Sequence, residues 1–462
     1  MNDNTLETKG IAPVRAASVE EWNRKGTVSI QTSFETVVSG RQRQGTKADL
    51  VRLLRVLAAA AVLTALLVSF NPFPTNIAKG DGVILNRVGY SLLAAFVLGT
   101  HVVVTDPRIL KHLLNPWWLL LLLPLPLSLW GAGWPPTGVR AMLFTFSTML
   151  AATGVLTLPP DARGFRTALI LACGAVLALS YAGIIMLPDR AIHTAAEVEA
   201  EHAGLWRGIY AHKNITGPVM AVIVFAGIYV VRSGRPLVGV ALTVLGLIFL
   251  FKTGSKTSLA LVPLIAAMAL LGPVLLGRGR TALALFLAVA GILALTLGAV
   301  IVPFFGDILH SLIPGTTFTG RTDLWQFALD LAAPLPWTGH GYENFWTTPY
   351  VEFAEKPFEL DWDMRGAANA HNSYLDVVLQ LGWPAVAIVL LVILVFPLVD
   401  YARCRPDIEN RRLADFFVMV LGFMLLNAAL ESFFFDREKQ AWLLAWIAVV
   451  GLRFTSRMTA EP

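Results

Sequence analysis

Long apolar runs separated by short polar connections recur along the chain from about residue 50 onwards. A run of about 20 apolar residues can cross roughly 30 Å of hydrocarbon as a helix. Runs such as Val56–Phe70 and Ala385–Val399 lack the apolar–polar alternation of a barrel strand. Because backbone polar groups must be satisfied inside a bilayer, these runs predict helices. The pattern therefore predicts an all-α polytopic membrane protein.

The runs predict about twelve transmembrane helices. Their expected limits are 51–70, 83–104, 116–130, 140–158, 167–187, 215–231, 237–251, 258–276, 282–303, 373–400, 414–430 and 440–455. The membrane domain (48–455) is preceded by a polar segment, 1–47, that we expect to be a disordered cytoplasmic tail. Residues 456–462 form a short C-terminal tail. A large external loop, 304–372, separates spans 9 and 10, and loops of that length are usually functional.

Basic residues concentrate in every second connection. The positive-inside rule places these connections, and with them both termini, in the cytoplasm. The other connections, which face outwards, include 131–139, 188–214, 252–257, 304–372 and 431–439. The isoelectric point near 9.2 therefore reflects membrane topology and does not indicate nucleic-acid binding.

Composition agrees with this class. Hydrophobic residues make up 56% of the chain and charged residues 15%, against about 25% in soluble domains. Mean hydropathy is +0.64. The two cysteines lie in a predicted span (Cys173) and a basic loop (Cys404), so no disulfide framework is indicated.

The outward connections carry the unusual polar residues. In "GLWRGIYAHKN" (204–214), Arg207, His212 and Lys213 precede a span that Asn214 or Thr216 can cap. A helix start directs free N–H groups outwards, which suits an anion. The alternative is that these are ordinary side chains at the membrane interface.

Two other connections add cations to the same face. The turn "KTGSKTS" (252–258) brings Lys252 and Lys256 to a helix start, although a tight turn with incidental lysines is an equal alternative. The connection "LSLWGAGWPPTGVR" ends at Arg140.

The long loop contains "GRTDLWQFALDLAAP", whose apolar positions share one helical face. This helix is expected to end before Pro334. Arg321 falls in its first turn, where the helix dipole disfavours a cation, so an anion is expected nearby. Asp323 is the local candidate and a bound phosphate the functional one. His340, between Gly339 and Gly341, is expected to be structural.

The loop ends in "ANAHNSYLDVVLQLGWP" (368–384), where Ser373 and Asp376 predict a capping box. His371 lies just outside this cap, and Glu431 is expected at the same depth. A histidine in such a place is more often structural than catalytic. The scattered histidines include no HExxH motif or His/Cys pair at ligand spacing, so neither a metal nor a cofactor is expected.

The order of these motifs resembles the O-antigen ligase and O-antigen polymerase superfamily. It runs Arg–Gly–x–x–x–His–Lys–Asn, a Ser/Lys turn, "GRTDLW", "GHG" and "HNSYLDVVLQLG". The resemblance covers about residues 115–450, and "YAHKN" and "TGSKTS" are closest to exopolysaccharide polymerisation proteins.

The resemblance implies a type C glycosyltransferase fold and a metal-independent, inverting enzyme in the cell inner membrane, active at the periplasmic face. The donor would be a glycan on undecaprenyl diphosphate, and the acceptor a sugar hydroxyl on a glycan or lipid. A chain-length regulator and a flippase would be its protein partners. The resemblance leaves open a ligase that transfers glycan to lipid A–core. A flippase or other transporter, or a non-catalytic assembly protein, are further alternatives.

The resemblance also implies roles for individual residues. Arg207 and Arg321 would bind the diphosphate, and His371 would be the general base, kept neutral because nearby cations lower its pKa. Related sequences often carry arginine where this chain has Lys256. Further substrate-binding candidates are Arg140, His212, Lys213, Asn214, Lys256 and Asn372. If His371 is structural, the base would be Glu343, Glu431 or His212.

Overall fold

The computed structural model describes residues 47–74, 81–104, 116–196, 200–318, 320–346, 348–355 and 363–458. The chain divides into two compact units, Met1–Leu54 and Arg55–Pro462. Of the first unit, only residues 47–54 are described, and they are helical. The rest of the predicted N-terminal tail lies outside the described residues, as do residues 459–462 of the predicted C-terminal tail.

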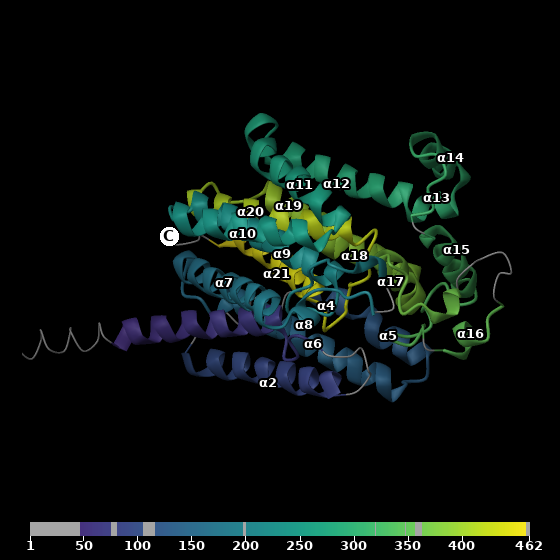
Figure 1. Ribbon diagram of the computed structural model, residues 1–462, viewed down its shortest axis with the longest axis horizontal. Helices are drawn as coiled ribbons and strands as arrows, with labels where there is room; N and C mark the ends of the chain where they lie inside the picture. The colour runs from purple at the N-terminus through teal and green to yellow at the C-terminus, as the bar shows by residue number, and fades with distance from the viewer. Residues whose placement is uncertain are drawn as a thin grey trace, which may run out of the picture. The chain divides into compact units, whose positions relative to one another are not determined.

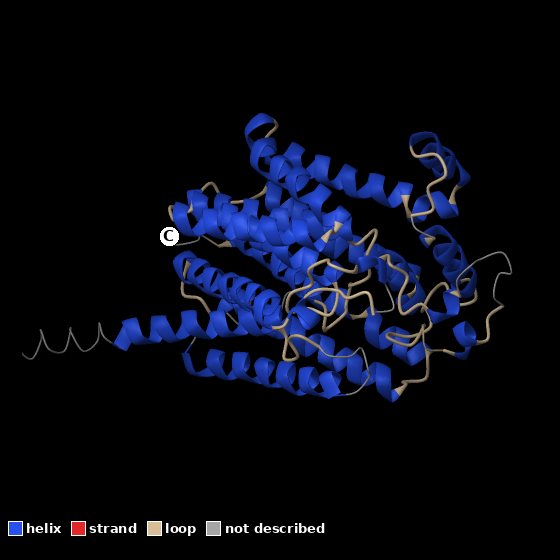
Figure 2. Cartoon of the chain, in the orientation of Figure 1, coloured by secondary structure: helices blue, strands red, loops and turns tan. Residues whose placement is uncertain are grey.

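Helices form the regular structure of the described residues, and Figure 2 shows no strand among them. The nearest approach to a strand is an isolated bridge between Ile192 and Trp206. Among the residues that the structure describes, eight helices are long and apolar enough to cross a bilayer, which confirms a polytopic helical membrane protein. They are Lys47–Val68, α6 (Pro136–Thr157), α7 (Ala162–Met186), α9 (Lys213–Arg232), α10 (Pro236–Thr253), α11 (Lys256–Leu275), Arg278–Ile301 and Trp383–Ala402.

Helices also occupy the remaining predicted spans. They are α2 (Asp81–Val104), α4 (Pro116–Leu122) followed by α5 (Pro124–Gly131), α20 (Ile408–Asn427) and α21 (Gln440–Arg457). Pro124 lies at the break between α4 and α5, because proline lacks the N–H that would continue the helix. The number twelve stays a prediction, since length and apolar composition support eight of the spans.

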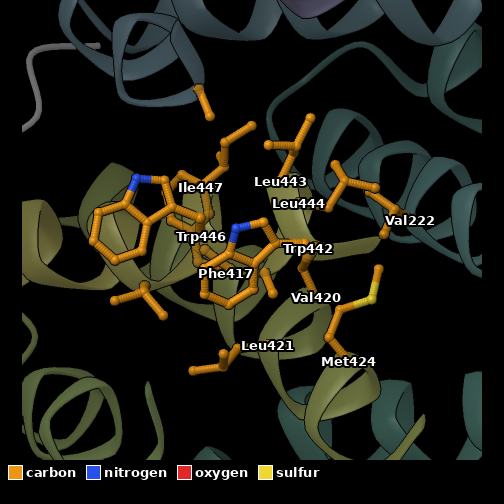
Figure 3. Close-up of a cluster of buried hydrophobic side chains, with 14 of the residues drawn as sticks. Val222, Phe417, Val420, Leu421, Met424, Trp442, Leu443, Leu444, Trp446 and Ile447 are labelled. Atoms are coloured by element: carbon orange, nitrogen blue, oxygen red, sulfur yellow. The ribbon is translucent and has the colours of Figure 1, made fainter. Parts of the chain in front are cut away.

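Helices α9, α20 and α21 pack against one another at the centre of the second unit (Figure 1). Trp442 and Trp446 of α21 lie in one buried cluster with Phe417 of α20 and Val222 of α9 (Figure 3). Close packing of these large side chains stabilises the association of the three helices through van der Waals contact. Helix α10 approaches α9 closely because Gly227 has no side chain: a Cβ there would lie 2.3 Å from the Oγ1 of Thr243.

The predicted span 373–400 is wrong in one respect, because two helices divide it. Helix α17 (Ser373–Leu381) ends at Gly382, and α18 (Trp383–Val389) starts a new span that continues through a π-helical stretch (Leu390–Val395) into α19 (Phe396–Ala402). Gly382 has φ 82°, and a Cβ there would lie 2.5 Å from backbone atoms of Trp337. The sharp turn and the close backbone contact therefore both require glycine.

Much of the described part of the long loop is helical. Its elements are α14 (Pro303–Leu312), α15 (Arg321–Ala332), α16 (Pro349–Glu352) and a 3₁₀ turn (Met364–Gly366). Helix α15 begins and ends as predicted, before Pro334. Its apolar face, including Leu324 and Trp325, packs on Leu375 and Leu379 of α17 in a cluster of its own. The loop thus carries a small core that holds the start of α15 beside the start of α17.

Candidate active site at one end of the helix bundle

A cavity of about 1050 Å³ lies where four connections of the second unit meet. Its walls come from the start of α9, the turn between α10 and α11, the start of α15, the segment before α17 and the connection between α20 and α21. All five segments belong to connections that the charge pattern predicts to face outwards. The charged and histidine side chains that line the cavity are Glu201, His202, Lys213, Lys256, Arg321, Asp363, His371 and Glu431.

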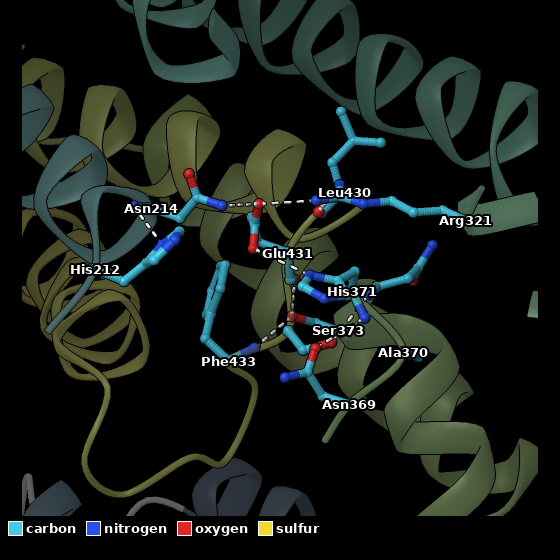
Figure 4. Close-up of polar contacts among 12 residues, drawn as sticks. His212, Asn214, Arg321, Asn369, Ala370, His371, Ser373, Leu430, Glu431 and Phe433 are labelled. Atoms are coloured by element: carbon cyan, nitrogen blue, oxygen red, sulfur yellow. Dashed lines mark hydrogen bonds and ion pairs between the residues drawn. The ribbon is translucent and has the colours of Figure 1, made fainter. Parts of the chain in front are cut away.

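Glu431 lies at the centre of the polar contacts in this cavity (Figure 4). Its Oε1 accepts hydrogen bonds from Nη2 of Arg321 at 3.2 Å and from Nδ2 of Asn214 at 3.3 Å. Its Oε2 lies 3.7 Å from Nδ1 of His371, within ion-pair distance. Burial alone raises the pKa of Glu431, but His371 and Arg321 outweigh burial and hold that pKa below its usual range. Glu431 is therefore a carboxylate that joins three candidate site residues.

Arg321 is the first residue of α15, after Gly320 in the left-handed conformation. The predicted anion beside it is Glu431, and Asp323 was the wrong candidate. A residue two positions along a helix points to a different side, so Asp323 cannot face Arg321. Nη1 of Arg321 also donates to the carbonyl of Leu430, which fixes the plane of the guanidinium.

His371 is held in a strained backbone conformation, with φ 49°. Its backbone N–H donates to Oδ1 of Asn369 at 3.0 Å. The Nδ1 atom is buried and has no hydrogen-bond partner among the described residues, whereas the side chain as a whole is 44% exposed in the cavity. Backbone strain of this kind is found at functional sites more often than elsewhere.

The predicted capping box of α17 is wrong. Asn372 caps the helix, because its Oδ1 accepts from the N–H groups of Tyr374 and Leu375. Its Nδ2 donates to the carbonyl of Ala429, so Asn372 is fully buried and does not line the cavity. Asp376 instead accepts hydrogen bonds from Trp346 and Ala370.

Ser373, two positions after His371, bonds to the backbone of the segment that carries Glu431. Its hydroxyl donates to the carbonyl of Glu431 at 2.7 Å and accepts from the N–H of Phe433 at 2.9 Å. Since Ser373 begins α17, these bonds tie the 431–433 segment to the residues that carry His371.

The predicted caps of α9 are also wrong, because the capping residue is His212. Its Nδ1 accepts from the N–H of Asn214 at 3.2 Å. Thr216 bonds back to the carbonyls of Arg207 and His212. Since capping does not use the Asn214 side chain, its amide can reach Glu431. His212 itself does not line the cavity. Its ring packs against that of His193, with 5.0 Å between the ring centroids.

Lys213 and Lys256 bring two more cations to the cavity, each at the first position of its helix. The two helix starts lie close together because Gly217 has no side chain. A Cβ on Gly217 would lie 2.8 Å from the Oγ of Ser258. Three connections thus supply three cations, Arg321, Lys213 and Lys256, to one space.

Besides Asn372 and His212, two more of the predicted site residues lie outside the cavity. The guanidinium of Arg207 donates to the carbonyls of Arg190, Asp189 and Ala211, so it holds the 188–211 segment together. Arg140 bonds to the carbonyl of Pro136 in its own helix. Neither side chain lines the cavity.

Sequence reasoning missed Glu201, His202 and Asp363 as lining residues, and it named Glu431 only as a neighbour of His371 and as an alternative base. Asp363 is paired with Arg365 at 2.7 Å. A single acidic residue in a loop gives no sequence signal of its own, because only the contacts in the folded protein distinguish a site residue from an ordinary surface residue. Glu343, the other acidic candidate for the base, pairs with Arg437 at 2.9 Å and does not line the cavity. Burial raises the pKa of Glu343, although the Arg437 charge opposes the shift.

Comparisons with known proteins support the superfamily. A family model described as O-antigen ligase matches residues 241–390, from α10 to the π-helical stretch before α19. The exopolysaccharide production protein ExoQ of Rhizobium meliloti (strain 1021) is 31% identical over 75 residues. That alignment spans 16% of this chain and 17% of the relative. Residues 241–390 therefore carry the domain of the O-antigen ligase family, and the resemblance to the O-antigen ligase and polymerase superfamily is confirmed.

Proposed function

We propose that this protein is a membrane glycosyltransferase of surface polysaccharide biosynthesis. It transfers a glycan from undecaprenyl diphosphate to a sugar hydroxyl at the periplasmic face of the cell inner membrane, with both termini in the cytoplasm. The observation that carries the proposal is the cavity that joins Arg321, Lys213 and Lys256 to the His371–Glu431 pair. Outside the cytoplasm no nucleotide sugars are supplied, so a lipid diphosphate is the activated donor that suits such a cavity.

In the proposed reaction, His371 accepts the proton of the acceptor hydroxyl. The hydroxyl oxygen attacks the anomeric carbon of the donor glycan, and the bond from that carbon to the diphosphate oxygen breaks. Undecaprenyl diphosphate leaves, and the anomeric configuration inverts. Glu431 lies close enough to the imidazole to stabilise its protonated form and to orient the ring, as the carboxylate of a Ser–His–Asp triad does.

The cations act on the leaving group. A guanidinium binds phosphate oxygens bidentately and stays ionised, which suits Arg321 to the diphosphate. Lys213 and Lys256 add point charges that stabilise negative charge as the bond breaks. Arg207 and Arg140 would reach the donor only if the 188–211 segment or the start of α6 moves towards the cavity when substrate binds.

A polymerase is favoured over a ligase, because the similar stretch of ExoQ belongs to a protein named for exopolysaccharide production. The second candidate, a ligase acting on lipid A–core, uses the same chemistry with another acceptor. Deleting the gene distinguishes them. Single repeats on the carrier lipid would indicate a polymerase, and long glycan accumulating on the carrier would indicate a ligase.

The direct test is transfer by purified protein supplied with glycan on undecaprenyl diphosphate, with and without acceptor. We expect longer glycan and release of undecaprenyl diphosphate only when both substrates are present, and neither with His371→Ala. Movement of intact donor across reconstituted vesicles without product would contradict the proposal and indicate a transporter.

A further inference from the structure

Two cavities of the second unit are joined by the same helices. Helix α9 begins at Lys213 in the active-site cavity and ends at Arg232 in a second cavity of about 680 Å³. Helix α20 runs the opposite way, from Ile408 in the second cavity to Asn427 in the first. Each has 20 residues, which span roughly 30 Å, the thickness of the hydrocarbon core. The second cavity therefore lies at the opposite membrane face, on the side predicted to be cytoplasmic.

Arginines dominate this second cavity, which we call the arginine cavity after Arg232, Arg278, Arg411 and Arg412. Asp415, the one carboxylate that lines it among the described residues, already serves two of them. Its Oδ2 lies 2.9 Å from Nη1 of Arg232, and its Oδ1 lies 2.8 Å from Nη2 of Arg278.

Glu409, a second carboxylate near this cavity, also pairs with two arginines. Glu409 lies 3.3 Å from Arg412 and 3.2 Å from Arg166, and it also accepts from the Tyr229 hydroxyl at 2.8 Å. The side chain of Arg411 has no ion pair or hydrogen bond among the described residues. Positive charge at this face is therefore in excess over the carboxylates that could neutralise it.

One guanidinium is also incompletely satisfied. Arg278 stacks over the ring of Tyr401 at 4.9 Å, and its Nη1 is buried without a hydrogen-bond partner among the described residues. A buried donor without an acceptor is unfavourable. An anion entering beside Arg278 would relieve this by a small shift of the side chain.

The remaining wall of the arginine cavity is apolar, and part of it is exposed on the surface of the protein. Val274 is 81% exposed and Ile408 is 66% exposed. Val274 belongs to the apolar span α11, so its exposed side chain faces lipid chains in a membrane. The cavity thus combines a group of guanidinium donors with an apolar side where an acyl chain can lie.

We propose that the arginine cavity binds the headgroup of an anionic phospholipid, with its phosphate among Arg278, Arg411 and Arg412 and its acyl chains along Val274 and Ile408. Arginines are common at the cytoplasmic ends of spans for topological reasons alone. Here they converge on one cavity, outnumber their carboxylates and adjoin a lipid-facing wall, as basic headgroup sites between membrane helices do. This site is independent of the glycosyl transfer proposed for the other face.

The test uses the purified full-length protein in detergent and follows its thermal unfolding midpoint. Phosphatidylglycerol, phosphatidylcholine and inorganic phosphate are titrated separately. We expect phosphatidylglycerol alone to raise the midpoint. Arg411→Glu, at an exposed residue, should raise the phosphatidylglycerol concentration needed for half of the shift about tenfold. Arg280→Glu is the matched control, because Arg280 is exposed at the same face and does not line the cavity.

Three results would overturn the proposal. Equal shifts with both lipids would show that no anionic headgroup is selected. An equal loss in Arg280→Glu would show that only the general surface charge matters. A full shift with inorganic phosphate would show an anion site that does not need a lipid.

Discussion

Arg321 and Glu431 are 110 positions apart in the chain, yet their side chains meet at 3.2 Å in the active-site cavity. The contact brings the start of α15 to the connection between α20 and α21. It also places the guanidinium beside the carboxylate that faces His371. Glu431 therefore contacts both Arg321, which is proposed to bind the donor, and His371, which is proposed to accept the proton.

Glu431→Gln is expected to lower glycan transfer by roughly 10- to 100-fold, since a neutral amide no longer stabilises a charged imidazole or pairs with Arg321. Donor binding, measured separately with labelled lipid-diphosphate glycan, should fall much less. Asp323→Asn is the control, because Asp323 lies in the same turn as Arg321 but outside the cavity. Equal losses in both variants would contradict the role of Glu431.

Arg321→Lys is expected to lose most activity although it keeps the charge. A lysine cannot donate to Leu430 and Glu431 and still present a bidentate face to phosphate. Arg207→Lys should differ, because Arg207 bonds to three carbonyls and its loss should lower the thermal midpoint as well as activity. Wild-type turnover by Arg321→Lys would exclude it from diphosphate binding.

His371→Asn is expected to bind donor normally but to transfer glycan about 10²- to 10⁴-fold more slowly. Asparagine tolerates the left-handed conformation at φ 49°, so a loss would not reflect backbone strain. Single-turnover transfer with purified donor and acceptor is the measurement. A fully active His371→Gln enzyme would instead show that the histidine is structural.

Glu431 also predicts a dependence of stability on pH. Its folded pKa is below the ordinary value of 4.5, so its contribution is fully present above about pH 4.5 and is lost as pH falls through the lower folded value. Thermal unfolding of wild-type and Glu431→Gln protein between neutral and acidic pH measures this. The difference between their midpoints should shrink below pH 4.5, and a constant difference would contradict the prediction.

The orientation is tested by labelling single cysteines from outside intact cells, in a protein with Cys173→Ala and Cys404→Ser. Cysteines at Ala196 and Phe353, both exposed, should react with an impermeant reagent. A cysteine at Arg280, exposed at the other end of the helices, should not. Asn410 is a poor probe, because it is fully buried and would not react from either side. Labelling at Arg280 would reverse the topology and overturn the periplasmic site.

The sequence by itself determined the helical membrane class, the limits of most spans and the start and end of α15. These features depend on local composition, since a helix satisfies its own backbone and only its apolar length decides whether it can cross a bilayer. The motif order was likewise enough to detect the resemblance to the superfamily that the family model supports. The same local reasoning brought Lys213, Asn214, Lys256, Arg321 and His371 to one face, where the cavity collects them.

Only the tertiary structure decided which of these polar groups meet. His212 rather than Asn214 caps α9, which leaves the Asn214 amide for Glu431. Arg207 turns to nearby carbonyls, and Gly382 breaks a run that is apolar on both sides. Hydrogen bonds and ion pairs have short range, so their partners depend on where distant segments are packed, and an apolar pattern along the chain does not encode that.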